Sequence, residues 1–297
     1  MFYREYPPPP QLTDHVQCLW ALEHDYRDPM HTHEHLWADT QIELILSYGE
    51  PYYRRIDGAR SDRGELPRNF VIGPFKKELL LYSDGLTGFV AVRFHPWGFG
   101  AFSALKMTQL INTILPAEEL LEGFPNLSMQ TADDPGESGQ VNAKLEILGN
   151  WLVRRLEEQP EKKTPVPAIA RSIKAEKGIV KIAELSAKFG INPRRLERLF
   201  ISEIGMSAKL FARILRFNHA KRLIEQDPEI GLAGLTYETG YADQAHFSHN
   251  FRELFGYTPA QFKALMRGWK EKMAGAAPGV GGLDADRLNV VFLQDKP

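Results

Sequence analysis

The sequence predicts an α+β protein, in which a β-rich, jelly-roll or cupin-like N-terminal domain with accessory helices precedes an all-helical C-terminal domain. Up to Phe94, short apolar runs alternate with Gly, Pro and Asp, as in sandwiches and small barrels. Beyond Pro96, apolar residues recur every three or four positions, which is typical of helices. The stretch from Ile179 to Gly268 contains the same arrangement of two short helices twice. At 297 residues the chain is also long enough for two domains.

The N-terminal half carries the strand signals. We expect strands at 15–24, 41–47, 69–73, 78–82 and 88–94. The four prolines from Pro7 to Pro10 resist both helix and central strand. Short strands at such close spacing predict a sandwich or small barrel, and we assign residues 1–160 to this domain.

Helices are expected after the strands, over 99–107, over 108–115 and from 116 to about 121. A longer helix at 140–158 carries an apolar stripe made of Val141, Leu145, Leu148, Leu152 and Leu156. The stripe fits ordinary core packing, and it also fits a helix–helix dimer seam, because two heptads are too few to decide.

A domain boundary is expected where periodicity disappears. Residues 159–167 hold three prolines and a charge run, so we place a linker at 161–172 and the helical domain at 173–272. The Gly- and Pro-rich tail, 273–297, is expected to be flexible. Its LNVVFLQ segment is read either as a strand returning to the first domain or as a frayed end.

The duplicated arrangement is a helix-turn-helix. In each copy a short apolar-periodic helix ends at a glycine, a capping residue follows, and a second helix closes on a phenylalanine. These residues are Gly190, Asn192 and Phe200 in the first copy and Gly240, Asp243 and Phe251 in the second. Between the copies, Ser207 is expected to cap a helix that runs to about Gln226, where Asp227-Pro228 stops it.

Charge is distributed unevenly. Residues 171–272 hold 18 Lys and Arg against 11 Asp and Glu, a net charge of +7. The remainder holds 18 against 27, a net charge of −9, so the whole chain comes to −2. A basic helical module on an acidic remainder is expected of a nucleic-acid-binding domain with a separate partner domain.

Many positions of the duplicated region match a known family. They are Leu185, Gly190, Leu196, Arg198, Phe200, Gly205, Ser207, Phe211, Arg216, Ala220, Leu223, Gly240-Tyr241, Asp243-Gln244, His246-Phe247-Ser248, Phe251, Phe255-Gly256 and Thr258-Pro259. This region resembles the DNA-binding domain of AraC/XylS-type transcription regulators, and matches in this order are more specific than one helix-turn-helix pattern. The stretch VRFHPWGFGAF, 92–102, carries a weaker resemblance to the sensor domain of one branch of that family. The resemblance implies duplex-DNA binding and an effector-sensing first domain.

The first recognition helix is expected at about 193–203. The side chains that face away from its apolar stripe are Arg194, Arg195, Glu197 and Arg198. By the family resemblance, Arg194, Glu197 and Arg198 face the groove, where arginine can donate to guanine and Glu can accept from cytosine. Glu197 can alternatively pair with Arg194 or Lys188 on a solvated surface.

The second recognition helix is expected at about 243–254. The resemblance places Gln244, Ala245 and His249 toward the groove, where Gln suits adenine and the Ala methyl suits thymine. No Lys or Arg lies between Arg222 and Arg252, so we expect the first helix to supply more of the binding energy. Contacts with phosphate are expected from Lys209, Arg213, Arg252 and Lys263, which are otherwise ordinary surface charges.

Two features of the first domain bear on what it binds. The HTHEH run offers His31, His33 and His35, with Glu43 downstream, as a weak metal candidate; a polar loop is the alternative, and we expect no metal. Trp20, Trp37, Phe94 and Trp97 are candidates to line an effector pocket, although any of them can equally fill the core. The competing functions are a metal-dependent, cupin-like enzyme and a ligand-free dimerisation module, each fused to a DNA-binding domain.

The expected partners follow from these assignments. They are double-stranded DNA, a small-molecule effector, RNA polymerase if the protein is an activator, and a second copy of the chain. Neither a cofactor nor a membrane is expected, and no catalytic motif was found. The single cysteine, Cys18, lies among apolar neighbours and is expected to be a buried thiol. A cytoplasmic location is expected, because no signal peptide or apolar span is visible.

Overall fold

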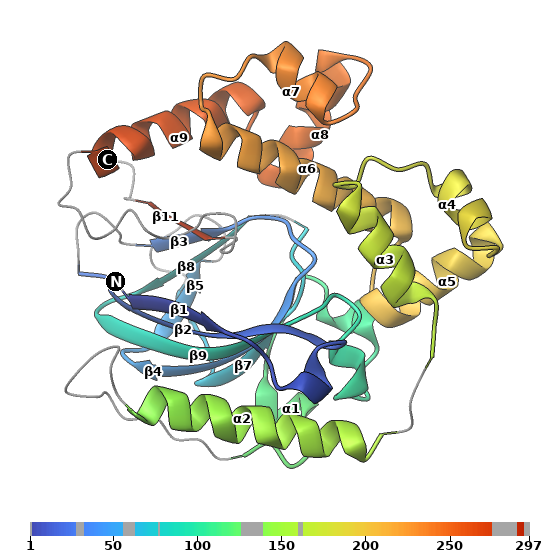
Figure 1. Ribbon diagram of the computed structural model, residues 1–297. Coiled ribbons are helices and arrows are strands. Elements are labelled where there is room, and N and C mark those ends of the chain that lie inside the picture. The colour runs from blue at the N-terminus through green and yellow to red at the C-terminus, as the bar shows by residue number, and fades with distance from the viewer. Residues whose placement is uncertain are drawn as a thin grey trace.

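The computed structural model describes residues 2–27, 33–55, 63–76, 78–125, 139–159, 163–274 and 290–293 (Figure 1). A two-sheet β domain occupies one side of the molecule, with a single long helix below it and a group of helices above it. The predicted order of a β-rich domain followed by a helical domain is therefore confirmed.

The β domain consists of two antiparallel sheets. The six-stranded sheet has the order β1 (Phe2–Tyr6), β2 (Val16–Asp25), β9 (Leu86–Phe94), β4 (Ile42–Gly49), β7 (Asn69–Ile72) and β10 (Ile114–Pro116). The five-stranded sheet has the order β11 (Val290–Leu293), β3 (His33–Leu36), β8 (Leu79–Ser83), β5 (Tyr52–Arg55) and β6 (Arg63–Glu65). All five predicted strands are present, each within a few residues of the expected bounds.

Side chains of the larger sheet alternate between two cores. On β9, Phe89 and Ala91 face the smaller sheet, whereas Val90 and Val92 face helix α2 (Gly139–Glu157). The apolar stripe predicted on this helix is buried against the sheet, where Leu148 and Leu152 are fully enclosed. The stripe therefore belongs to the core of the β domain and not to a dimer seam.

The helices predicted at 99–107 and 108–115 are wrong. The chain forms only two 3-10 turns there, η2 (Phe99–Ala101) and η3 (Met107–Leu110), before β10, and a third, η1 (Pro10–Leu12), lies near the N-terminus. Phe99, Phe102 and Leu110 are each buried in the same core. Short tight turns let these closely spaced apolar side chains all reach one core, which a regular helix would spread around its axis. Helix α1 (Ala117–Leu120) follows as expected.

The helical domain contains α3 (Val166–Ala175), α4 (Ile182–Lys188), α5 (Pro193–Ile204), α6 (Ala208–Gln226), α7 (Leu232–Glu238), α8 (Gln244–Phe255) and α9 (Pro259–Ala274). Because α3 begins at Val166 and buries Ile169 and Ile173, the linker predicted at 161–172 extends too far. The tail predicted to be flexible contains strand β11, which pairs with β3, so the described part of the LNVVFLQ segment, Val290–Leu293, does return to the first domain.

The two domains share apolar contacts. Trp37 is a residue of the β domain, yet it is fully buried in the helical core. Its ring lies 5.2 Å from the Phe262 ring in an edge-on arrangement, and the Lys221 Nζ lies 5.2 Å from the centre of the Trp37 ring. Among the described residues, no helix is long and apolar enough to cross a membrane.

Candidate DNA-binding interface

The first helix-turn-helix unit is formed by α4 and α5. Gly190 ends the first helix with a φ of +59°, a left-handed conformation that favours glycine. The Asn192 Oδ1 then accepts a hydrogen bond from the Arg194 backbone N–H at 2.9 Å, which caps α5 as predicted. Pro193 occupies the first position of the helix, where its missing N–H costs nothing.

Helix α5 has one buried and one exposed face. Leu196, Phe200 and Ile204 are buried in the helical core. The four residues predicted to face DNA are all exposed: Arg194, Arg195, Glu197 and Arg198. No ion pair involving Glu197 is found among the described residues. The exposed face therefore presents three cations and one anion that can reach base edges or phosphates.

The second unit, α7 and α8, repeats this construction. Gly240 has a φ of +65°, and the Asp243 Oδ1 accepts from the His246 backbone N–H at 2.7 Å. Phe247 and Phe251 are buried. The predicted contact residues Gln244, Ala245 and His249 are exposed, so the second unit presents a face of little charge.

Helix α6 connects the two units. The Ser207 side chain accepts from the Leu210 backbone N–H at 3.0 Å, and the helix continues for 19 residues to Gln226, as predicted. At about 1.5 Å per residue its length is about 28 Å. Arg216 fixes α6 to its neighbours, because its guanidinium lies 5.1 Å from the centre of the Tyr241 ring and Nη2 donates to the Gly178 carbonyl oxygen at 3.4 Å.

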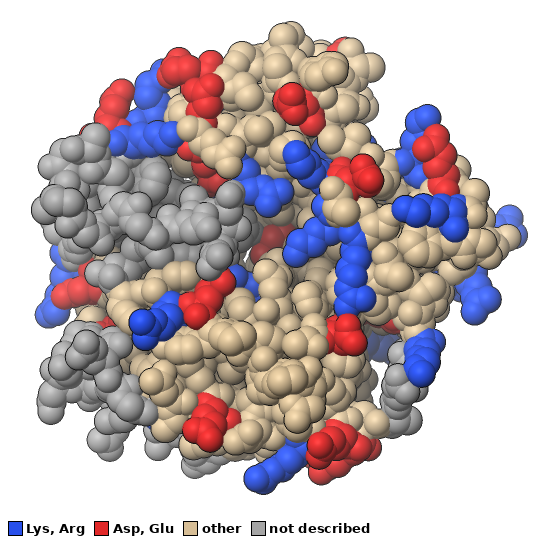
Figure 2. All heavy atoms as spheres, in the orientation of Figure 1, with Lys and Arg blue, Asp and Glu red and all other residues tan. Residues whose placement is uncertain are grey.

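The predicted phosphate contacts divide into two kinds. Lys209 and Arg252 are exposed and available to an anion. Arg213 instead donates to both carboxylate oxygens of Glu253, at 3.1 and 3.3 Å, with 30% of its side chain exposed. Lys263 donates to the Ile230 carbonyl oxygen at 2.6 Å. In Figure 2, blue side chains lie over α3 to α5, whereas the surface over α7 is mostly uncharged.

The four aromatic residues proposed for an effector pocket do not lie together. Trp20 packs between the two sheets, Phe94 packs under α2, and Trp37 lies in the helical core. Only Trp97 lines a cleft that the structure describes. Sequence alone could not separate these roles, because strand pairing and domain docking decide which core each ring enters.

The described part of the histidine run, from His33 onward, forms a strand where a polar loop was the alternative. His33 and His35 belong to β3, and His31 lies outside the described residues. The Glu43 carboxylate accepts from the Arg93 Nε at 2.6 Å. The residues that the structure describes contain no cluster of His, Cys, Asp and Glu suited to a metal. Cys18 is buried, as expected.

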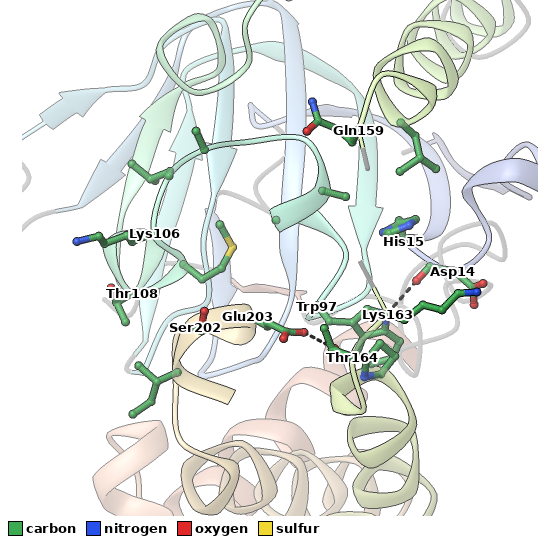
Figure 3. Close-up of a pocket in the computed structure, with 18 of the residues that line it drawn as sticks. Asp14, His15, Trp97, Lys106, Thr108, Gln159, Lys163, Thr164, Ser202 and Glu203 are labelled. Atoms are coloured by element: carbon green, nitrogen blue, oxygen red, sulfur yellow. Dashed lines mark hydrogen bonds between the residues drawn. The ribbon is translucent and has the colours of Figure 1, made fainter. Parts of the chain in front are cut away.

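A cleft that the sequence did not predict lies between the domains (Figure 3). It has a volume of about 1040 Å³. Its walls come from the β domain at Asp14, His15 and Trp97, from the segment around Lys106, from the linker at Lys163 and Thr164, and from the last turn of α5 at Ser202 and Glu203. Because these segments are far apart in the sequence, no local pattern reveals the cleft.

Comparison with known proteins agrees with this architecture. Residues 185–264 match the family described as "Helix-turn-helix domain", and residues 4–116 match a domain of unknown function, DUF6597. The HTH-type transcriptional activator RhaR of Salmonella dublin is 23% identical over 86% of this chain and 94% of its own length. The HTH-type transcriptional regulator GlxA of Rhizobium meliloti is 38% identical, but over 25% of this chain and 22% of its own.

One solved structure, ToxT from Vibrio cholerae, covers 90% of this chain and 99% of its own, at 10% identity and a TM-score of 0.46. The helical domain contains two capped helix-turn-helix units joined by α6, the helix-turn-helix family match covers these units, and the relatives are transcription regulators. The helical domain is therefore a double helix-turn-helix domain, and the chain is similar over most of its length to HTH-type transcription regulators, as the resemblance to the AraC/XylS family implies.

Proposed function

We propose that α5 and α8 enter the major groove at successive turns on one face of a duplex. The observation that carries this proposal is the presence of two exposed, N-capped helix faces at the two ends of α6. Successive major-groove faces are about 34 Å apart, close to the length of about 28 Å for α6. Because the two faces carry different residues, the DNA site need not be a palindrome.

The two recognition helices have unequal roles in this proposal. Arg194 and Arg198 donate to guanine, and Glu197 accepts from cytosine. On α8, Gln244 suits adenine, Ala245 suits the thymine methyl and His249 lies nearby. Arg195, Lys209 and Arg252 serve as phosphate contacts, whereas Arg213 orients Glu253 at the surface between the units.

The test is selection of bound sequences from random duplex DNA with the full chain. We expect a two-part, asymmetric motif with the stronger sequence preference in the half that α5 contacts. Affinity should fall with salt at a log–log slope of about −0.9 for each phosphate neutralised. Recovery of no motif above scrambled competitor at moderate ionic strength would refute the proposal.

We also propose that residues 1–160 form an effector-responsive domain with no catalytic activity. The supporting observations are the packing of Trp37, Ala38 and Trp97 of this domain in the helical core and the cleft between the domains. Within this proposal the protein works in the cytoplasm, where its DNA lies. It contacts RNA polymerase if it activates transcription, and it can act as a homodimer. Binding of a stoichiometric metal, or turnover of a substrate, would favour the enzyme alternative instead.

A further inference from the structure

The cleft between the domains has the size and lining of a small-molecule site. At about 1040 Å³ it lies at the upper end of the range typical for such sites. Its apolar lining includes Trp97, Leu105, Met107, Leu156 and Ile201. These side chains come from the β domain, from the end of α2 and from α5, so any occupant touches both domains.

Two acceptor atoms in this cleft lack partners among the described residues. The Thr164 Oγ1 donates to the Glu203 Oε2 at 2.7 Å, but the Glu203 Oε1 is buried and accepts no hydrogen bond. The His15 Nδ1 is likewise buried without a partner. Burial lowers the pKa of His15 and favours the neutral ring, in which one nitrogen accepts a hydrogen bond and the other donates, whereas Asp14 and a hydrogen bond with the Gly98 backbone act in the opposite direction. Buried polar atoms are nearly always paired in folded proteins, so these two atoms are positions at which a ligand can form hydrogen bonds.

The other charged groups of the cleft either have a protein partner or are exposed to water. The Arg171 Nη2 donates to the Asp14 Oδ1 at 2.7 Å, and its guanidinium lies 5.1 Å from the centre of the Trp97 ring. Lys106 and Lys163 are exposed to water. Glu203 is therefore the acidic residue of the cleft with a buried oxygen that accepts no hydrogen bond, and a carboxylate oxygen forms its strongest hydrogen bonds with a cationic donor.

We propose that this cleft binds a small primary amine with an apolar body. The ammonium group donates to the Glu203 Oε1, and the apolar body packs on Trp97, Leu105 and Leu156. Glu203 belongs to the last turn of α5, and Thr164 belongs to the segment that joins the domains. Binding therefore favours the docked arrangement of α5 against the β domain.

The binding site itself does not depend on DNA recognition, whereas its regulatory effect rests on the proposed function. Ligand binding and DNA binding are therefore measured separately. Three aromatic probes of similar size differ only in the polar group: 2-phenylethylamine, 2-phenylethanol and 3-phenylpropanoate. Calorimetric titration of the full chain should give an affinity for the amine at least about tenfold higher than for the carboxylate.

Variants localise the binding. Glu203→Gln keeps an acceptor for Thr164 and removes the charge, so we expect the affinity for the amine to fall about tenfold. Glu176→Gln neutralises an exposed carboxylate at the end of α3, outside the cleft, and should leave the affinity for the amine unchanged. Ala104→Trp, at an exposed position of the cleft wall, should block all three probes without touching Glu203.

Two results would overturn the proposal. One is equal affinity for the amine and the carboxylate. The other is unchanged amine binding in both Glu203→Gln and Ala104→Trp, with thermal unfolding used to verify that each variant is folded. Duplex binding without any probe, retained in Glu203→Gln, would show that a failure here leaves the DNA-binding function intact.

Discussion

Arg198 and Lys209 illustrate how exposed cations in one module differ in expected role. Arg198 projects from the exposed face of a recognition helix, whereas Lys209 lies in the first turn of α6. The first position suits a base edge and the second suits the sugar-phosphate backbone. Sequence could predict that both side chains are exposed, because helix periodicity determines which side chains face away from the core, whereas their roles on DNA stay predictions.

Arg198→Ala should cost about 1–3 kcal/mol on the selected site and relax discrimination at one base pair. The reason is loss of a bidentate contact with guanine. Lys209→Ala is the matched control: it should weaken binding to every sequence equally and reduce the salt slope by about 1. Binding titrations on cognate and random duplexes measure both. Equal losses on both duplexes for Arg198→Ala would identify it as a phosphate contact.

Glu34 gives the stability a pH dependence. Its carboxylate is buried between the sheets, where it accepts a hydrogen bond from the Tyr26 hydroxyl, and burial raises its pKa to about 7 from 4.5. The folded protein therefore holds this proton more tightly than the unfolded chain. The contribution of Glu34 to the free energy of unfolding is fully present below about pH 4.5 and is lost as the pH rises through about 7. The loss is on the order of 3 kcal/mol.

We therefore expect the thermal midpoint of the protein to fall between about pH 5 and pH 8. Glu34→Gln, which keeps the shape and cannot ionise, should lose this dependence. Calorimetric scans of both proteins across the range measure it. If the thermal midpoint of the wild type fell with pH no more steeply than that of the variant, the pKa of Glu34 would not differ between the folded and unfolded states.

At the level of elements, local signals predicted the helical domain well and the β domain less completely. The capping hydrogen bonds of Asn192, Ser207 and Asp243 join residues only two or three positions apart, so the sequence could predict where those helices begin. Strand β5, in contrast, depends on pairing with β8, and no run of residues near Tyr52 encodes that partner. The cleft was missed for the same reason, since Glu203 and His15 line one cleft only because the two domains dock.

Substitution by alanine should lower the stability by different amounts at two glycines that end equivalent helices. Gly205 ends α5 with a φ of +86°, and a Cβ there would lie 2.4 Å from the Met107 carbonyl oxygen. Gly256 ends α8 with a φ of +75°, where the nearest atom would be 3.8 Å away. Gly256→Ala should cost about 1–2 kcal/mol from backbone strain alone. Gly205→Ala should cost about 2–5 kcal/mol, because η3 must also move.

Thermal unfolding of the two glycine variants measures this difference. A larger loss of stability in Gly205→Ala would establish that the end of α5 packs against the β domain in solution. Similar losses at both positions would contradict that contact.

For the whole molecule, Trp37 couples the two domains. Its ring lies in the helical core, where it packs on Phe262. Trp37→Ala should cost about 3–5 kcal/mol and separate the unfolding of the two domains into distinct calorimetric transitions. Trp151→Ala is the control, because Trp151 packs on Phe124 within the β domain, with 5.5 Å between ring centres. A single transition that merely shifts in Trp37→Ala would show that other contacts suffice to couple the domains.

The pairing of β11 with β3 attaches the helical domain to the β domain a second time, through Val290, in addition to the chain connection through Thr164. If the Trp37 and Arg171 contacts open, both ends of the released domain still lead to its partner. Rejoining is then an intramolecular step at high effective concentration, so we expect it not to depend on the protein concentration.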